Sequence, residues 1–477
     1  MSTSRDRYRV LQLSVNYVRI NSKLAETIKG YILRDIFMIE KPPQWQKLIT
    51  ADLIEKIGGS KEIQEILSKA RKEYVYWDKF RHYPFPKNIT PEEAWTFLKL
   101  SRVSNEKTPI KSVFGAYFTY SITKNLYQKL NFIDTHGAGL LKTFNERPSN
   151  MQTSKYIISS LTEEAIASSQ IEGANTTHKV AKEMILSQRK PKNKSEQMIV
   201  NNYLAMQKME EWKDLDLTED ILLDLQKILL DQTVDDQSII GRFRYDDDEI
   251  VVHDPITGEV AHTPPEQKVM MSELKEMIAY ANTPEDNQEE FTHPVIKATI
   301  LHFWFAYLHP FVDGNGRSSR AIFYWFLLKR NYWLIEYISV SRAIKQSRKA
   351  YDNAFLYSEN DDNDMTYFLL YITETFKKSI LQFMDHFEKK MKETEELRKT
   401  TSILGTFNVR QVAVLKYFLV HSDEYIDVIT HQNKHGISRP SAYNDLRLLV
   451  QKGYLVETRK SKRFVYMPNI AKIKKIL

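Results

Sequence analysis

The stretch that decides the fold is His309-Pro310-Phe311-Val312-Asp313-Gly314-Asn315-Gly316-Arg317-Ser318-Ser319-Arg320. It is a polar loop with two glycines that lies between two apolar runs. Apolar residues recur at helical spacing before it, over 295–307, and again after it, over 321–328. The pattern predicts two helices joined by a glycine-rich turn that enters the second helix.

The residue types in this loop suit the binding of phosphate. A glycine-rich turn at a helix start exposes backbone N–H groups, and the helix dipole adds positive potential. Arg317 and Arg320 are three residues apart, so both side chains can face the same site. Asp313 can hold a magnesium ion, which needs only one or two carboxylates beside phosphate oxygens. His309 is then a candidate base for a hydroxyl nucleophile.

The stretch resembles the signature of the Fic-domain family, H-x-F-x-(D/E)-G-N-G-R-x-x-R. Every specified position matches, namely His309, Phe311, Asp313, Gly314, Asn315, Gly316, Arg317 and Arg320. At average residue frequencies such a match arises by chance less than about once in a million chains of this length. A glycine turn that merely joins two helices, beside a buried histidine, is the alternative.

The resemblance implies a protein adenylyltransferase that moves AMP from ATP to a Ser, Thr or Tyr hydroxyl of a target protein. It gives His309 the role of base and Asp313 that of the Mg²⁺ ligand. Asn315 and the backbone of Gly314 and Gly316 would stabilise phosphate oxygens. Arg317 and Arg320 would hold the β- and γ-phosphates. ATP and Mg²⁺ are the expected cofactors.

A second motif lies upstream, at Ser168-Ser169-Gln170-Ile171-Glu172-Gly173. It resembles the inhibitory motif of the same family, (S/T)-x-x-x-E-(G/N), with Ser168, Glu172 and Gly173 at the specified positions. It ends an amphipathic helical pattern, and Gly173 is a plausible helix cap. The resemblance implies that Glu172 pairs with Arg320 and so removes a partner of the terminal phosphate. A surface glutamate at a helix end is the alternative.

Several activities remain open at this stage. The same site could remove AMP from a modified protein, with Glu172 orienting a water. The signature does not specify the donor uniquely, so another phosphate-containing group could be transferred. The chain could also be a DNA-binding regulator whose nucleotide site senses rather than catalyses.

Composition describes an ordinary globular protein of 477 residues, 42% hydrophobic and 27% charged. It contains no cysteine, which excludes disulfides and thiolate zinc sites and fits a reducing cytoplasm. The amino terminus lacks an apolar run of signal-peptide length, and no stretch approaches the roughly 18 apolar residues that span a bilayer. We therefore expect a cytoplasmic protein without a membrane partner. The oligomeric state stays open, with a homodimer as one option.

Glycines are few and strand-like alternation is scarce, so we expect a mostly α fold. Three parts are expected: a helical region over 1–145, a Fic domain with its inhibitory helix over 146–395, and a small domain over 400–477. The one clear non-helical part of the Fic domain is a β-hairpin signal over about 250–262, around Pro255 and Gly258. The resemblance implies a flap that pairs with an extended segment of the target protein. An ordinary surface hairpin is the alternative.

The carboxyl-terminal part is strongly basic. From residue 401 onward, 13 Lys and Arg stand against 5 Asp and Glu, a surplus of eight that exceeds the +7 of the whole chain. Residues 407–467 read as a winged helix-turn-helix, with a turn at 435–437, a helix capped by Ser438 and two strands around a basic hairpin. The candidate DNA contacts are Arg439, Asn444, Arg447, Arg459, Lys460, Lys462 and Arg463. A winged helix that contacts protein is the alternative.

Overall fold

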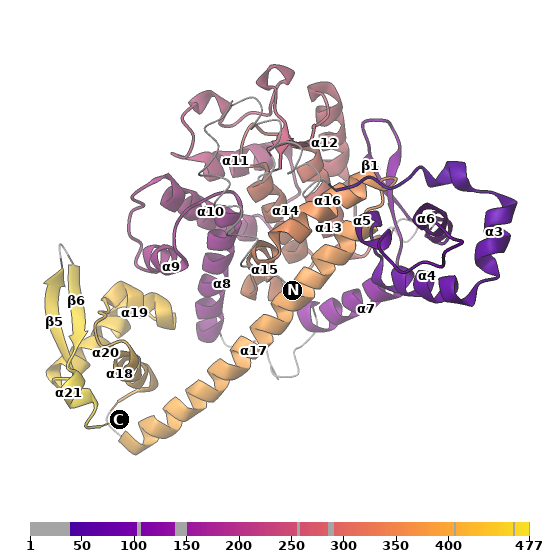
Figure 1. The fold of residues 1–477 in the computed structure, drawn as a ribbon. Coiled ribbons are helices and arrows are strands. Elements are labelled where there is room, and N and C mark those ends of the chain that lie inside the picture. The colour runs from indigo at the N-terminus through magenta and orange to yellow at the C-terminus, as the bar shows by residue number, and fades with distance from the viewer. Residues whose placement is uncertain are drawn as a thin grey trace, which may run out of the picture. The chain divides into compact units, whose positions relative to one another are not determined.

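The structure is a computed structural model that describes residues 39–102, 106–138, 150–254, 258–284, 291–404, 407–460 and 463–476 (Figure 1). The chain divides into two compact units. One comprises Met1–Val103 with Glu249–Pro264, and the other comprises Ser104–Asp248 with Pro265–Leu477. The described residues are mostly helical and contain three two-stranded antiparallel sheets, as the expected mostly α class requires.

The first unit is a small helical body. Its elements are the 3₁₀ helix η1 (Trp45–Leu48) and the α-helices α3 (Ala51–Gly58), α4 (Lys61–Glu73), α5 (Trp77–Phe80) and α6 (Pro91–Leu100). Thr90 begins α6 with a capping box, because its side chain accepts from the N–H of Glu93 while the Glu93 carboxylate accepts from the N–H of Thr90. In its core, Trp95 packs edge to face against Trp77 and in a tilted arrangement against Phe80.

The same unit contains the hairpin that the sequence predicts over about 250–262. Strand β3 (Val252–His253) pairs antiparallel with β4 (Val260–His262). The turn between them is closed by a bond from the Gly258 N–H to the Asp254 carbonyl, with Gly258 at φ 71°. The left-handed conformation explains the glycine there. Residues 255–257 of this turn lie outside the described part of the chain.

The second unit holds most of the chain. Its first elements are β1 (Glu106–Lys111), β2 (Tyr117–Tyr120), α7 (Lys124–Ile133), a π-helical turn (Asp134–Ala138), α8 (Asn150–Ile171), α9 (His178–Leu186), α10 (Lys194–Glu211) and α11 (Glu219–Leu230). There follow η3 (Gln237–Ile239), η4 (Asp246–Asp248), α12 (Gln267–Asn282), α13 (Pro294–Leu308), α14 (Asn315–Lys329) and η6 (Trp333–Tyr337). The helices α15 (Val340–Gln346), α16 (Arg348–Asn360) and α17 (Thr366–Leu404) complete its central part.

The prediction of only helix before residue 145 is wrong for residues 106–120. These residues form an antiparallel hairpin that reverses at Gly115, which has φ 79°. Thr108 and Ile110 of β1 and Phe118 and Tyr120 of β2 are buried, so the burial alternates with the period of a strand. The segment YFTY is rich in the aromatic and β-branched residues that strands favour, which was the available signal.

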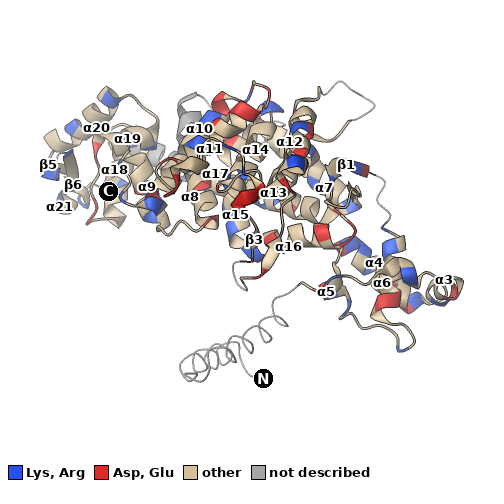
Figure 2. Ribbon diagram, turned by 90° about the horizontal axis from the view of Figure 1, so that it is seen from above, with Lys and Arg blue, Asp and Glu red and all other residues tan. Residues whose placement is uncertain are grey.

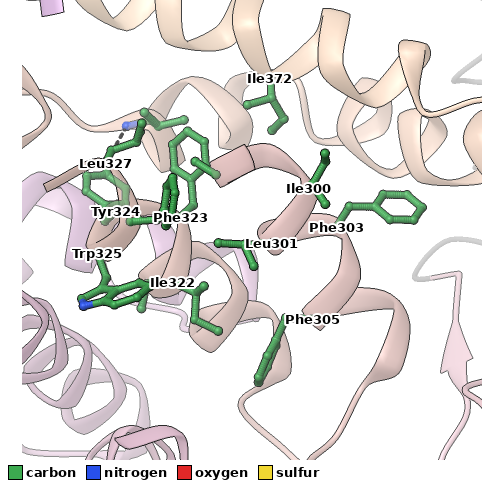
Figure 3. Close-up of a cluster of buried hydrophobic side chains, with 14 of the residues drawn as sticks. Ile300, Leu301, Phe303, Phe305, Ile322, Phe323, Tyr324, Trp325, Leu327 and Ile372 are labelled. Atoms are coloured by element: carbon green, nitrogen blue, oxygen red, sulfur yellow. Dashed lines mark hydrogen bonds between the residues drawn. The ribbon is translucent and has the colours of Figure 1, made fainter. Parts of the chain in front are cut away.

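The core of the second unit is built on α13 and α14, the two helices that the opening stretch predicts. Nearly every residue of α13 is buried, and a cluster of aliphatic and aromatic side chains fills the space around the pair (Figure 3). Phe118 of the β1–β2 hairpin packs against Phe303 and Tyr307 of α13, with ring centroids 5.2 and 5.4 Å apart. Such packing on all sides holds the loop between α13 and α14 in one conformation.

The carboxyl-terminal elements follow the expected order. They are α18 (Val409–Val420), α19 (Val428–His435), α20 (Arg439–Gln451), the paired strands β5 (Leu455–Lys460) and β6 (Arg463–Pro468), and α21 (Ile470–Ile473). Gly436 ends α19 in the left-handed conformation, and the Ser438 side chain caps α20 by accepting from the N–H of Ser441. Among the described residues, no helix is both long and apolar enough to cross a bilayer.

Candidate functional site

His309 ends α13 in an unusual backbone conformation. Its φ of 48° lies in the left-handed region, which is uncommon for a residue with a side chain. Its N–H donates to the Phe305 carbonyl, and its Nδ1 lies 3.3 Å from the Ala306 carbonyl oxygen. A carbonyl can only accept, so this contact places a proton on Nδ1, and in the neutral ring Nε2 is then unprotonated. Nε2 then carries the lone pair that a general base needs.

Arg244 holds the backbone around His309, a role that sequence reasoning missed. Its side chain is buried, with Nε donating to the His309 carbonyl at 2.8 Å and Nη2 donating to the carbonyls of Leu308 and Pro265. Its own N–H donates to the Pro310 carbonyl at 2.9 Å. These bonds offset the strain of the left-handed turn, typically 1–3 kcal/mol. Only burial distinguishes Arg244 from its neighbours, and burial cannot be read from an isolated arginine.

The side chain of Asn315 stabilises the loop through hydrogen bonds to its backbone. Its side chain is buried, its Oδ1 accepts from the Phe311 N–H at 2.9 Å, and its Nδ2 donates to the Phe311 carbonyl at 2.7 Å. The resemblance assigned this side chain to phosphate, yet in this structure both of its polar groups bind the loop backbone. Gly314 precedes α14 with φ 92°, a conformation that glycine adopts without strain.

The first backbone N–H groups of α14 lie at the helix start, where no preceding turn supplies carbonyl partners. Gly316 belongs to this first turn. A Cβ atom there would clash with the carboxylate of Glu172. The side chain of Glu172 therefore lies over the amino-terminal end of α14, where the helix dipole favours an anion.

Asp313 is half exposed, with a relative side-chain exposure of 53%. Its Oδ1 accepts from the Gly314 N–H and lies 3.3 Å from Nη2 of Arg317. Among the described residues no group of three or more His, Cys, Asp or Glu side chains is placed to hold a metal. A single accessible carboxylate suits Mg²⁺ only when phosphate oxygens complete the coordination, so the donor set fits a metal that arrives with a nucleotide.

The two arginines of the signature have different partners. Arg317 is 1% exposed, and its Nη1 donates to the Leu229 carbonyl at 2.9 Å, near the end of α11. Arg320 is also buried, and its Nε donates to Ser168 Oγ at 2.9 Å. Its Nη2 donates to the Ser168 carbonyl at 3.1 Å and to Oε1 of Glu172 at 2.9 Å.

The structure thus brings the upstream motif to the loop. Ser168 lies on α8 and Glu172 directly follows it, while Gly173 adopts φ 93° after the helix end. Burial by itself would raise the pKa of Glu172, but the charges of Arg320, Arg348 and Arg317 outweigh it and the pKa is lowered. Glu172 is therefore ionised at neutral pH and forms an ion pair with Arg320.

The candidate DNA contacts fall into three groups. Arg439, Asn444 and Arg447 are exposed on α20, and Arg459 and Lys460 are exposed on β5. Figure 2 marks in blue the Lys and Arg positions of the carboxyl-terminal elements. Arg463 is engaged, because its Nη1 donates to the Ser187 carbonyl at 2.9 Å and lies 3.7 Å from Asp427. Lys462 lies outside the described residues.

Asp445 is a buried acid in α20 that sequence reasoning missed. Its carboxylate accepts from Arg410 and Asn408 and contacts His431, so it joins α18, α19 and α20. Burial opposes its ionisation, but His431, Arg410 and Asn408 together hold its pKa well below the usual range. This network fixes the position of the exposed face of α20.

Part of the chain, which includes the loop, is similar to known proteins. Residues 216–327 match the model of the Fic/DOC family. A protein adenylyltransferase Fic from Drosophila grimshawi is 31% identical over 71 residues, which cover 15% of this chain and 14% of that protein. The protein of the same description from Nematostella vectensis is 31% identical over 71 residues, covering 15% and 16%. The matches therefore span only about a seventh of the relatives' lengths.

Two solved structures match this chain at low similarity. A Fic family protein from Desulfovibrio desulfuricans G20 has 18% identity and a TM-score of 0.44, covering 73% of this chain and 98% of that chain. Fic-1 from C. elegans has 18% identity and a TM-score of 0.46, covering 78% and 94%. The residues 216–327 that match the family model include α13, the loop and nearly all of α14.

Proposed function

We propose that the chain is a protein adenylyltransferase that transfers AMP from ATP to a hydroxyl side chain of a target protein. The observation that carries the proposal is the loop of the Fic domain, where His309 and the start of α14 flank one polar site. The named relatives are protein adenylyltransferases, which supports the same reaction here.

The reaction follows from the groups in the loop. His309 Nε2 takes the proton of the target hydroxyl, whose oxygen attacks the α-phosphorus of ATP. The bond from that phosphorus to the bridging oxygen breaks and pyrophosphate leaves. The N–H groups at the start of α14 stabilise phosphate oxygens, and positioning and charge stabilisation supply most of the rate. Asp313 would hold Mg²⁺, which when bound offsets negative charge on the phosphates.

Glu172 is the proposed inhibitor of this reaction. Its carboxylate lies over the first turn of α14 and bonds Arg320, the residue proposed to hold the γ-phosphate. ATP can bind only with its terminal phosphate displaced while this pair persists. A bias of about 2.7 kcal/mol toward the paired state would keep 99% of molecules inactive.

The position of the label in ATP tests the reaction. Purified protein carrying Glu172→Gly is incubated with ATP labelled at the α- or the γ-phosphorus, with and without Mg²⁺. We expect protein labelling from α-labelled ATP alone, and His309→Ala should reduce it by about 10²–10⁴-fold, the usual loss for a general base. Labelling from the γ-position, or unchanged labelling in the His309→Ala protein, contradicts the proposal.

The same site could run in reverse, with Glu172 orienting a water that releases AMP from a modified protein. A carboxylate beside the phosphate site is a suitable group for that role. If Glu172→Gly abolishes release of AMP from a modified target and produces no transfer, removal of AMP is the principal activity.

Two partners are proposed beside the nucleotide. An extended segment of the target protein pairs with the β3–β4 hairpin by strand addition, with main-chain hydrogen bonds along about residues 250–262. DNA binds the carboxyl-terminal elements, read as a winged helix, through the exposed residues of α20 and β5. The basic surplus after residue 401 supports DNA over a protein partner.

A further inference from the structure

A second arginine contacts the carboxyl end of α8. Arg348 is the first residue of α16, and its Nη1 donates to the carbonyl oxygen of Ile171. Ile171 is the last residue of α8 and immediately precedes Glu172. A helix end leaves its last carbonyls without intrahelical partners, so this bond satisfies one of them with a charged donor.

Arg348 is itself held in place. Its Nε lies 2.8 and 2.9 Å from the two carboxylate oxygens of Asp352, one turn further along α16. Because the carboxylate fixes one edge of the guanidinium, Nη1 is left directed at α8. The arginine is thus oriented before it meets the helix end.

A lysine of the preceding helix, α15, contacts Gln170 of α8, the residue before Ile171. Lys345, near the end of α15, donates to Oε1 of Gln170, whose Nε2 donates to the Thr176 carbonyl at 2.7 Å. The junction of α15 and α16 therefore contacts two consecutive residues, Gln170 and Ile171. Both contacts lie directly before the glutamate that pairs with Arg320.

Arg348 and Arg320 bind two neighbouring residues, Ile171 and Glu172, at different groups. Arg320 bonds the Glu172 side chain, and a nucleotide phosphate competes for that contact. Arg348 bonds the backbone one residue earlier, which a phosphate need not displace. Burial would raise the pKa of Glu172, and the charge of Arg348, after that of Arg320, helps to lower it.

We propose that Arg348, oriented by Asp352, is a positioning residue that fixes the end of α8 so that Glu172 reaches Arg320. The inference rests on the proposed inhibition by Glu172. Without the bond to Ile171 the last turn of α8 frays, as helix ends do when their carbonyls lack partners. Glu172 then spends less time at Arg320, and motion at the α15–α16 junction becomes a means of activation.

The test uses the full chain with Arg348→Ala, Arg348→Lys and Asp352→Asn, each alone and combined with Glu172→Gly. We expect Arg348→Ala to raise AMP transfer about tenfold, as the loss of one charge-assisted hydrogen bond implies. Arg348→Lys should restore part of the inhibition, and Asp352→Asn should give a smaller rise. None of the three should raise transfer further once Glu172 is glycine, because they act through that residue.

Arg342→Ala is the matched control. Arg342 lies on α15 and its Nη1 is 3.8 Å from Glu163, which also belongs to α8 but lies well before its end. Its removal should leave transfer unchanged. A rise equal to that of Arg348→Ala would mean that any weakening of the α8 contacts activates the protein, and the specific role of Arg348 would be rejected.

Hydrogen exchange gives a second readout that does not depend on the reaction. The N–H groups of Glu172 and Ala174 both donate to the Ser169 carbonyl, at 3.1 and 3.0 Å. Arg348→Ala should speed exchange at these amides and leave the middle of α8 protected. Unchanged exchange overturns the proposal whatever the activity.

The remaining outcomes separate the two proposals. If Glu172→Gly fails to activate, the inhibitory role of Glu172 is wrong. Faster exchange in Arg348→Ala would still show that Arg348 fixes the end of α8. If Arg348→Ala lowers transfer in the Glu172→Gly background, Arg348 contacts the nucleotide and its assignment as a positioning residue is overturned.

Discussion

The Glu172 carboxylate occupies the space that a side chain on Gly316 would fill. A side chain at Gly316, the second glycine of the Gly-Asn-Gly turn, would therefore have to displace the Glu172 carboxylate. Two motifs that are far apart in the sequence depend on each other at this one contact.

Gly316→Ala should weaken the pairing of Glu172 with Arg320, because the new methyl group pushes the carboxylate away. The helix itself tolerates alanine well, since alanine is favoured over glycine in helices by about 1 kcal/mol. We expect the activation produced by Glu172→Gly to be smaller in the Gly316→Ala protein than in the wild type. Rates of α-label transfer from all four proteins form the cycle, which cancels any direct effect of alanine on the nucleotide site. Equal activation in both backgrounds would contradict the contact.

Glu172→Gly should raise AMP transfer by up to about 100-fold, the factor that corresponds to a bias of about 2.7 kcal/mol. Adding Arg320→Ala should cancel the gain, because the mutation works by releasing that arginine for the γ-phosphate. Glu163→Gly, in the same helix and away from Arg320, is the control and should not activate. The idea fails if the Glu172→Gly, Arg320→Ala protein stays as active as Glu172→Gly.

The buried residue His302 predicts a pH dependence of stability in the core of the second unit. Its Nε2 lies 2.8 Å from the Tyr351 hydroxyl, and burial, aided by the charge of Arg320, lowers its pKa to about 3. Below the ordinary histidine pKa of about 6.5 the unfolded chain binds a proton that the folded chain does not. The free energy of unfolding should therefore decrease as the pH is lowered, and this group should contribute about 2 kcal/mol of the decrease between pH 7 and pH 5.

Comparison with His302→Gln isolates the contribution of His302. Urea unfolding followed by tryptophan fluorescence at pH 7 and pH 5 gives the free energy of unfolding of both proteins. We expect the advantage of the wild type over the variant to shrink by about 2 kcal/mol at pH 5. If the free energy of unfolding changes equally with pH in the two proteins, His302 has the same protonation state in the folded and the unfolded chain, and the prediction is wrong.

Salt dependence should separate DNA from protein as the partner of the carboxyl-terminal elements. In the full chain, replacing Arg459 and Lys460 by glutamine should weaken DNA binding on every sequence and reduce the slope of log affinity against log salt by about 2. Arg463→Gln should have a smaller effect on the slope, because Arg463 already bonds Ser187. Asn444→Ala should alter sequence preference more than affinity. If binding at about 0.15 M salt is no tighter than about 10⁻⁴ M, the surface contacts protein.

Much of the fold could be predicted because its signals are local. The helices α13 and α14, the cap at Ser438 and the turn at Gly436 each depend on a few adjacent residues. The β1–β2 hairpin was missed because its alternation is short and lies within a helical context. A strand of six residues offers few repeats of its period, so helix and strand are hard to distinguish there.

The sequence predicted which residues belong to the candidate site, but it did not predict their contact partners. Sequence spacing placed Arg317 and Arg320 on adjacent faces of one helix, but their partners Leu229 and Ser168 lie 88 and 152 residues away. Arg244 and Asp445 act through burial, which arises only when distant segments pack. Local pattern carries no information about such partners, so these two roles required the structure.

The order of Glu172 and His309 along the chain has a consequence for biosynthesis. Glu172 is synthesised 137 residues before His309, which at about 5–20 residues per second is roughly 7 to 30 s earlier. The proposed inhibitor has therefore left the ribosome before the catalytic loop exists. Under the proposed inhibition, a chain that folds as it emerges would hold the inhibitory helix before it completes the catalytic loop.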